Sequence, residues 1–217
     1  MRRRAKRRLR RRRICLSGGG RRVGSALAYR AIPMQTAYCG AKFAVRGFTD
    51  AVRAELLHER SSIRLSMVQL PAINTPQFSW VRNRLPRRVQ PVPPVFQPEV
   101  AARAILWAAE HGPTELNVGW PTMLAILGQA LAPGLMDRYV ARFAWSGQMT
   151  EMPPDQGGPD NLWSPTPADV AAHGLFDGSA RPAATQQILA THPAAVRAVA
   201  GLMAVAGLSW VARRRSS

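Results

Sequence analysis

Three short stretches of the chain have the residue pattern of β-strands. Ile63–Leu70 alternates apolar and polar side chains and stops at Pro71, which is typical of a strand. Thr114–Val118 is a shorter stretch of the same kind. Val23–Ala26 has the residues of a strand end that opens into a loop.

Between and after these stretches, apolar residues recur at the spacing of helices. The pattern predicts one long helix over residues 38–57. A second, amphipathic helix is predicted over residues 98–110, with a proline at its start and Gly112 just past its end. Residues 123–143 predict two further helices, which are broken at Pro133.

The long helix carries a tyrosine and a lysine whose spacing suggests chemistry. Tyr38 and Lys42 are four residues apart, so a helix places them on the same face. A cation near a phenol lowers the phenol pKa from its ordinary value of about 10. The Ser25 hydroxyl, from a separate segment, could hold a substrate oxygen near the phenol. These groups suit proton transfer to or from an alcohol or carbonyl during hydride chemistry. A solvated lysine on a surface helix is the alternative interpretation.

The order of these motifs resembles that of the short-chain dehydrogenase/reductase family over residues 23–120. In that family a serine after one strand and a Tyr-x-x-x-Lys on the next helix form the active site. The resemblance implies that Tyr38 is the general acid/base and that Ser25 orients the substrate. It also implies that Lys42 binds the nicotinamide ribose, lowers the tyrosine pKa and contacts the cofactor together with Tyr38.

A further part of the resemblance follows the strand predicted at residues 63–70. The segment Pro71–Pro76 is similar to the family's Pro-Gly-x-x-x-Thr segment, which contacts the nicotinamide. The similarity implies that Pro71 and Thr75 contact the cofactor. Ala72 stands where the family usually has glycine, and the threonine comes one position early. A plain strand-to-loop turn is the alternative explanation of these residues.

The resemblance implies reversible hydride transfer between NAD or NADP and a small-molecule alcohol or carbonyl. A dinucleotide-binding half opens with a strand, a glycine-rich turn and a helix that receives the pyrophosphate. The residues before Tyr38 are too few for two such units, and the glycine cluster Ser17–Arg22 is interpreted as a flexible loop. We therefore expect an α/β fold that is the C-terminal portion of the family, a partial Rossmann-like parallel sheet with flanking helices.

The first 22 residues are strongly basic and predict a disordered segment. They hold twelve of the 30 Lys and Arg residues and no acid, and without them the formal net charge falls from +18 to +6. Such a segment could bind nucleic acid nonspecifically or hold to anionic lipid. Its abrupt change into family-like sequence at Val23 favours a truncated or frame-shifted product, whose activity would need a partner to supply the pyrophosphate site.

The competing hypothesis is a non-catalytic basic protein that binds an anionic membrane surface or nucleic acid through its Arg-rich segment. Family members commonly associate through the helix that carries Tyr-x-x-x-Lys, so the resemblance also implies a homo-oligomer. Binding of nicotinamide cofactor separates the two hypotheses, because only the enzyme requires it.

Beyond residue 120 the sequence predicts further structural elements but no additional site residues. Appended helices are expected over residues 121–146 and a Pro- and Gly-rich linker over 147–193. Residues 194–217 contain an apolar run, Ala198–Ala212, between arginines. As a helix this run rises about 22 Å, short of a hydrocarbon core of roughly 30 Å, but a snorkelling arginine could extend it. A membrane tether and a helix docked on the protein's own surface are the alternatives.

The cysteines and histidines predict neither a disulfide nor a metal site. Cys15 and Cys39 have no framework spacing, and no apolar core follows the N-terminal charges as in a secretory signal. A cytoplasmic location is therefore expected. The histidines lack metal-ligand spacing and are interpreted as structural or surface residues.

Overall fold

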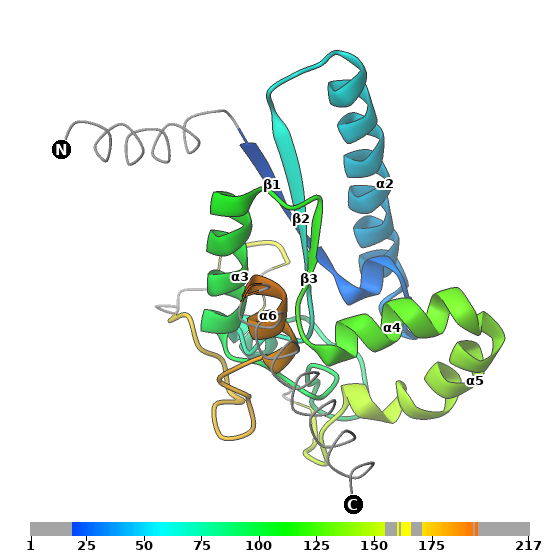
Figure 1. The fold of residues 1–217 in the computed structure, drawn as a ribbon. Helices are drawn as coiled ribbons and strands as arrows, with labels where there is room; N and C mark the ends of the chain where they lie inside the picture. Colours follow the sequence, from blue (N-terminus) through cyan, green and yellow to red (C-terminus); the bar gives the residue numbers. More distant parts are fainter. Residues whose placement is uncertain (1–18, 155–159, 161, 166–170, 193, 195–217) are drawn as a thin grey trace, which may run out of the picture.

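A computed structural model describes residues 19–154, 160, 162–165, 171–192 and 194 of the chain. Three strands form one parallel sheet in the order β1-β2-β3 (Figure 1). Their bounds are Gly19–Ser25 for β1, Arg64–Leu70 for β2 and Glu115–Asn117 for β3. All three predicted strands are therefore confirmed.

Two helices provide the crossover connections that parallel strands require. Helix α2, Thr36–His58, leads from β1 to β2, and helix α3, Pro98–His111, precedes β3. The two helices cover opposite faces of the sheet (Figure 1). The fold is thus α/β, a partial Rossmann-like parallel sheet with flanking helices, as predicted.

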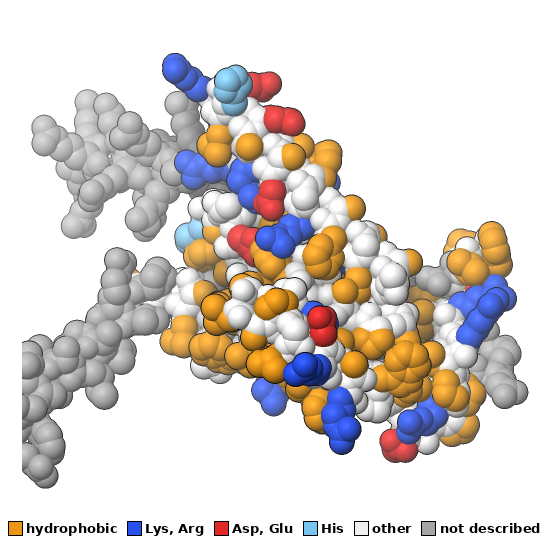
Figure 2. All heavy atoms as spheres, turned by 90° about the vertical axis from the view of Figure 1, so that its right-hand side faces the viewer, with side chains coloured by type: hydrophobic (Ala, Val, Ile, Leu, Met, Phe, Trp, Pro, Cys, Tyr) orange, Lys and Arg blue, Asp and Glu red, His pale blue; other side chains and the backbone are white. Residues whose placement is uncertain are grey.

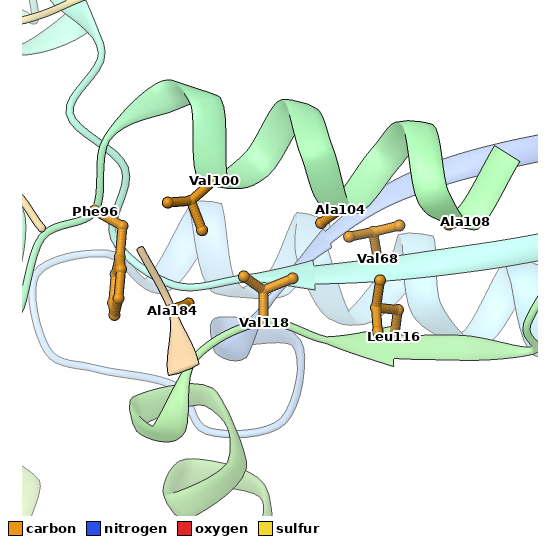
Figure 3. Close-up of a cluster of buried hydrophobic side chains, with 8 residues drawn as sticks. All are labelled: Val68, Phe96, Val100, Ala104, Ala108, Leu116, Val118 and Ala184. Atoms are coloured by element: carbon orange, nitrogen blue, oxygen red, sulfur yellow. The ribbon is translucent and has the colours of Figure 1, made fainter. Parts of the chain in front are cut away.

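The core lies between α3 and the sheet. Its buried members are drawn in Figure 3: Val68, Phe96, Val100, Ala104, Ala108, Leu116, Val118 and Ala184. The helix meets the strands with small side chains, since Ala104 and Ala108 are fully buried. Helix α3 ends where predicted, because Gly112 takes the left-handed conformation (φ 61°) that favours glycine.

The two helices predicted after the sheet are also present. They are α4, Trp120–Leu131, and α5, Pro133–Phe143, and Figure 1 shows them as a hairpin beside the sheet. The first residue of α5 is Pro133, which cannot continue the preceding helix but is well suited to start a new one.

The interpretation of the glycine cluster as a flexible loop was wrong for its last four residues. Gly19 to Arg22 belong to β1, where Gly19 pairs with Arg64 and Gly20 with Leu65. A Cβ on Gly20 would come within 2.6 Å of the Leu65 side chain. The lack of a side chain on Gly20 therefore allows Leu65 of the neighbouring strand to lie close to its backbone. Pairing with β2 gives strand structure to a segment whose own composition favours a loop.

The interpretation of residues 147–193 as a linker was wrong for two packed parts. Met149 is buried and forms an isolated antiparallel bridge with Val89. A short helix, α6, spans Thr185–Thr191, and Ala184 before it enters the core. Composition indicated a loop, but these backbone groups find partners on the domain.

Three short 3-10 helices complete the description. They are η2 at Ala26–Ala28, η3 at Pro76–Ser79 and η4 at Ser146–Gln148. The disorder predicted for residues 1–22 was wrong for Gly19 to Arg22, which belong to β1, and residues 1–18 lie outside the described residues. Of the apolar helix and tether predicted over residues 194–217, residues 195–217 also lie outside them. Among the residues that are described, no helix is long and apolar enough to cross a membrane.

Candidate active site

Ser25 lies at the carboxyl end of β1, directly beside the end of β2. It pairs in register with Leu70, so Pro71 follows at the same edge of the sheet. The Ser25 hydroxyl accepts a hydrogen bond from the Leu27 N–H at 3.2 Å and thereby starts η2. Carboxyl edges of parallel sheets are where such folds bind ligands.

Tyr38 approaches this serine from the first turn of α2. A hydrogen bond from the Ser25 hydroxyl by itself lowers the pKa of Tyr38, but partial burial is the larger influence and raises it above its ordinary value. The ring remains 47 % exposed, so a ligand can reach it. The structure therefore brings these two predicted site residues together, with a protonated phenol at neutral pH.

Lys42 lies one turn further along α2 but does not act on the phenol as expected. Its Nζ is 5.4 Å from the centroid of the Tyr38 ring and 3.5 Å from the Val23 carbonyl oxygen. The ammonium therefore lies over the ring, and it is not among the causes of the Tyr38 pKa shift. The expectation of a lowered pKa was wrong for the protein alone, because burial outweighs the hydrogen bond from Ser25.

The loop after β2, which holds Pro71 and Thr75, is fixed through its backbone. The Phe96 N–H donates to the Ala72 carbonyl at 2.9 Å, and the Asn74 N–H donates to the Phe96 carbonyl at 2.8 Å. Thr75 precedes η3 and makes no side-chain cap to it. A cofactor contact at Pro71 or Thr75 stays a prediction, since no ligand tests it.

Sequence reasoning missed the residue that organises this loop, Asn74. Its fully buried amide donates to Asp177 Oδ1 at 2.8 Å and to Gln97 Oε1 at 3.2 Å, and its Oδ1 accepts from the Phe176 N–H at 3.1 Å. Gly174 lies so close that a Cβ would come within 2.7 Å of Asn74 Oδ1. A segment about a hundred residues away thus packs on the loop predicted to contact the cofactor.

The same segment is fastened by His173. Its Nδ1 lies 2.8 Å from Asp177 Oδ1 and its Nε2 lies 2.7 Å from Glu99 Oε1. These hydrogen bonds, the one to Asp177 first, raise the pKa of His173. The interpretation of His173 as a structural residue is consistent with these contacts, but the sequence did not indicate that Glu99 on α3 would be its partner. The part of the chain that is described holds no cluster of three metal-ligating side chains.

Comparison with known proteins gives a family match over part of the chain. Residues 21–85 match the family model of the short chain dehydrogenases. An oxidoreductase of Bacillus subtilis, described as the uncharacterized YxnA, is 33% identical over 135 residues, which are 60% of this chain and 37% of that protein. The putative oxidoreductase SadH of Mycobacterium tuberculosis is 41% identical over 64 residues, 29% of this chain and 23% of that protein.

This chain is similar to short-chain dehydrogenases. Among solved structures, a short chain dehydrogenase from Burkholderia cenocepacia in complex with NADP matches with 23% identity and a TM-score of 0.42, over 58% of this chain and 48% of that one. The chain spans 37% of the length of the Bacillus subtilis protein.

The family match corrects one prediction. The chain was expected to be the C-terminal portion of the family, but the match lies at residues 21–85 and corresponds to the family's N-terminal Rossmann region. The error has a structural reason, because a Rossmann domain repeats one strand-helix-strand unit. A single unit such as β1-α2-β2 does not reveal from its own pattern which repeat it is.

Proposed function

We propose that this chain carries the acid/base site of an NAD(P)-dependent oxidoreductase that interconverts a small-molecule carbonyl and alcohol. The observation that carries the proposal is the meeting of the Ser25 and Tyr38 hydroxyls at the carboxyl edge of the parallel sheet. One hydroxyl can orient a substrate oxygen while the other exchanges a proton with it.

The electrostatics of the site favour the direction of carbonyl reduction. Because burial raises the pKa of Tyr38, its phenol stays protonated at neutral pH and can act as a general acid. As hydride reaches the carbonyl carbon, the Tyr38 proton moves to the oxygen and the Ser25 hydroxyl holds that oxygen in place. A second positive charge near the phenol would lower the pKa of Tyr38 and favour the reverse reaction.

The donors at this edge fit the nicotinamide end of a dinucleotide. The Lys42 ammonium and the Tyr38 hydroxyl lie one helical turn apart and could both bind the hydroxyls of a ribose. When bound, the nicotinamide supplies or accepts the hydride. We assign no residue to the pyrophosphate, because in the described residues β1 leads directly into the three-residue η2 and not into a glycine-rich turn that opens a helix.

Cofactor binding and turnover by the full chain test the proposal in two steps. The first is a titration with NADH and with NADPH, followed by nicotinamide fluorescence. The second is reduction of a panel of aldehydes and ketones, followed by the loss of nicotinamide absorbance. We expect saturable binding, and a Tyr38→Phe variant that still binds cofactor, because the Lys42 contact to the ribose remains, but turns over at least a hundredfold more slowly.

The matched control is Tyr139→Phe, which removes the hydroxyl of an exposed tyrosine on α5. This variant should keep the full rate. Unchanged turnover in Tyr38→Phe would refute the role of the tyrosine, and a full chain that binds neither nicotinamide cofactor would refute the proposed function itself.

A further inference from the structure

The α4–α5 hairpin (residues 120–143) is attached to the body through its polar side. Arg30, which follows η2, donates from Nη1 to Gln129 Oε1 at 2.7 Å and from Nη2 to Asp137 Oδ1 at 2.6 Å. The Arg30 side chain is only 13% exposed. An amphipathic helix of a globular protein normally turns its apolar side inward. On these two helices the buried side chains are those of Thr122 and Val140, so the large apolar side chains of the hairpin are mostly not turned inward.

Their large apolar side chains point outward and form what we call the apolar face. On α4 and α5 its members are between 48% and 82% exposed: Trp120, Leu124, Leu127, Leu131, Leu135, Tyr139 and Phe143. Singly exposed apolar residues are normal on protein surfaces, but a contiguous group of this size usually marks an interaction site. Figure 2 views the molecule from the side of α2 and the hairpin and shows hydrophobic side chains at the surface there.

The helical repeat makes the apolar face continuous. The members on α4 recur at spacings of four, three and four residues, and those on α5 at spacings of four, so each set forms one stripe. The helices meet where Met136 packs against Gly128, since a Cβ there would come within 2.7 Å of the Met136 sulfur. In an antiparallel pair, the residue spacings place both stripes on the same side of this contact.

The charges around the apolar face indicate which kind of partner it binds. Between Glu115 and Glu151 the sequence has one acid, Asp137, and its charge is compensated by Arg30. Arg138 and Arg142 are exposed on α5, and Arg142 lies 5.9 Å from the centre of the Phe143 ring. Exposed leucines and aromatic rings flanked by arginines are typical of helices that lie in the interface of anionic membranes.

A second copy of the chain suits the same surface less well. If two copies met symmetrically through the apolar face, each would bring Arg138 and Arg142 toward the other, and the hairpin offers no uncompensated acid to pair with them. Anionic lipid headgroups supply that negative charge.

We propose that the α4–α5 hairpin docks on the surface of an anionic lipid bilayer, with its apolar face between the headgroups and the first part of the acyl chains. Arg138 and Arg142 bind the headgroups, while the Arg30 contacts hold the hairpin on the sheet. The hairpin lies on the bilayer and does not cross it.

The test measures how the full chain binds vesicles of phosphatidylcholine alone and of phosphatidylcholine with 30% phosphatidylglycerol. We expect binding to the anionic vesicles only, and an at least tenfold lower partition coefficient for the double variant Leu127→Glu/Leu131→Glu. The matched control is Leu57→Glu, which adds an acid at a comparably exposed leucine on α2. It should bind like the unaltered chain, and circular dichroism should show that all variants fold.

A depth measurement separates the hairpin from other basic or apolar parts of the chain that could also bind vesicles. A dye attached to Leu131→Cys, in a chain whose two natural cysteines are replaced by alanine, should be quenched by lipids brominated near the headgroup. The same dye at Leu57→Cys should not. Bound protein without quenching at residue 131 would overturn the proposal. A double variant that changes from dimer to monomer while it binds vesicles as before would also overturn it, because a second copy would then cover the apolar face.

Discussion

Replacing Asn74 by alanine should destabilise the protein and release the segment that packs on the loop after β2. The substitution removes three side-chain hydrogen bonds, two donated to Gln97 and Asp177 and one accepted from the Phe176 N–H. Each contributes roughly 1 kcal/mol, and the partners are left in a partly buried site, so we expect a loss of about 3 kcal/mol in the free energy of unfolding. Urea unfolding followed by tryptophan fluorescence measures this loss.

Limited trypsin digestion reports on the same segment directly. The Arg181 backbone is held at both sides, because its N–H donates to Val95 and its carbonyl accepts from Gln97, each at 2.9 Å. In Asn74→Ala we expect faster cleavage after Arg181, identified by mass spectrometry. The matched control is Asn83→Ala, whose side chain bonds to residues two and four positions away. A loss below about 1 kcal/mol in Asn74→Ala, equal to that of the control, would refute the reasoning.

Three further substitutions test other parts of the structure. His173→Gln should remove a pH dependence: the raised pKa of His173 stabilises the fold below about pH 6.5, and this contribution is lost as the pH rises through the folded-state pKa. The pKa values of Glu99 and Asp177 are lowered, so the same contribution is also lost in acid, when these carboxyl groups become protonated. The melting temperature of the variant should therefore change less between about pH 5 and 8 than that of the unaltered chain. Val100→Ala should cost about 2 kcal/mol in urea unfolding, because it empties a fully buried site, and a cost near zero would contradict the described core. Gly112→Ala should cost about 1 kcal/mol, because its φ of 61° strains any residue with a Cβ, and an equal or higher stability would contradict that conformation.

The elements with a clear residue pattern could be predicted from the sequence. The alternation before Pro71, the helical spacing after Tyr38 and the proline and glycine that bound α3 are local signals, and all three elements formed where they indicated. Gly19 and Gly20 were misjudged because their strand exists through pairing with β2. Pairing with a strand 45 residues further along the chain cannot be predicted from the two glycines alone.

The residues of the candidate site could be predicted from the sequence, but the pKa shift of its tyrosine could not. Spacing alone suggested that Tyr38 and Lys42 share a helix face, and the structure places the ammonium over the ring. Whether the pKa of Tyr38 is raised or lowered depends on how much water the folded chain excludes from the phenol, and a sequence motif does not encode this. The hydrogen-bond partners of Asn74 and His173 could not be predicted for a related reason, since they lie on segments that only the tertiary fold brings together.

The place of Ala184 has a practical consequence for anyone who shortens this protein. This residue, 68 positions after Leu116 on β3, closes the end of the core beside Phe96. A fragment cut at the last sheet strand, or at the hairpin that follows it, would therefore expose an aromatic ring to water and tend to aggregate. Working fragments should retain the chain through α6.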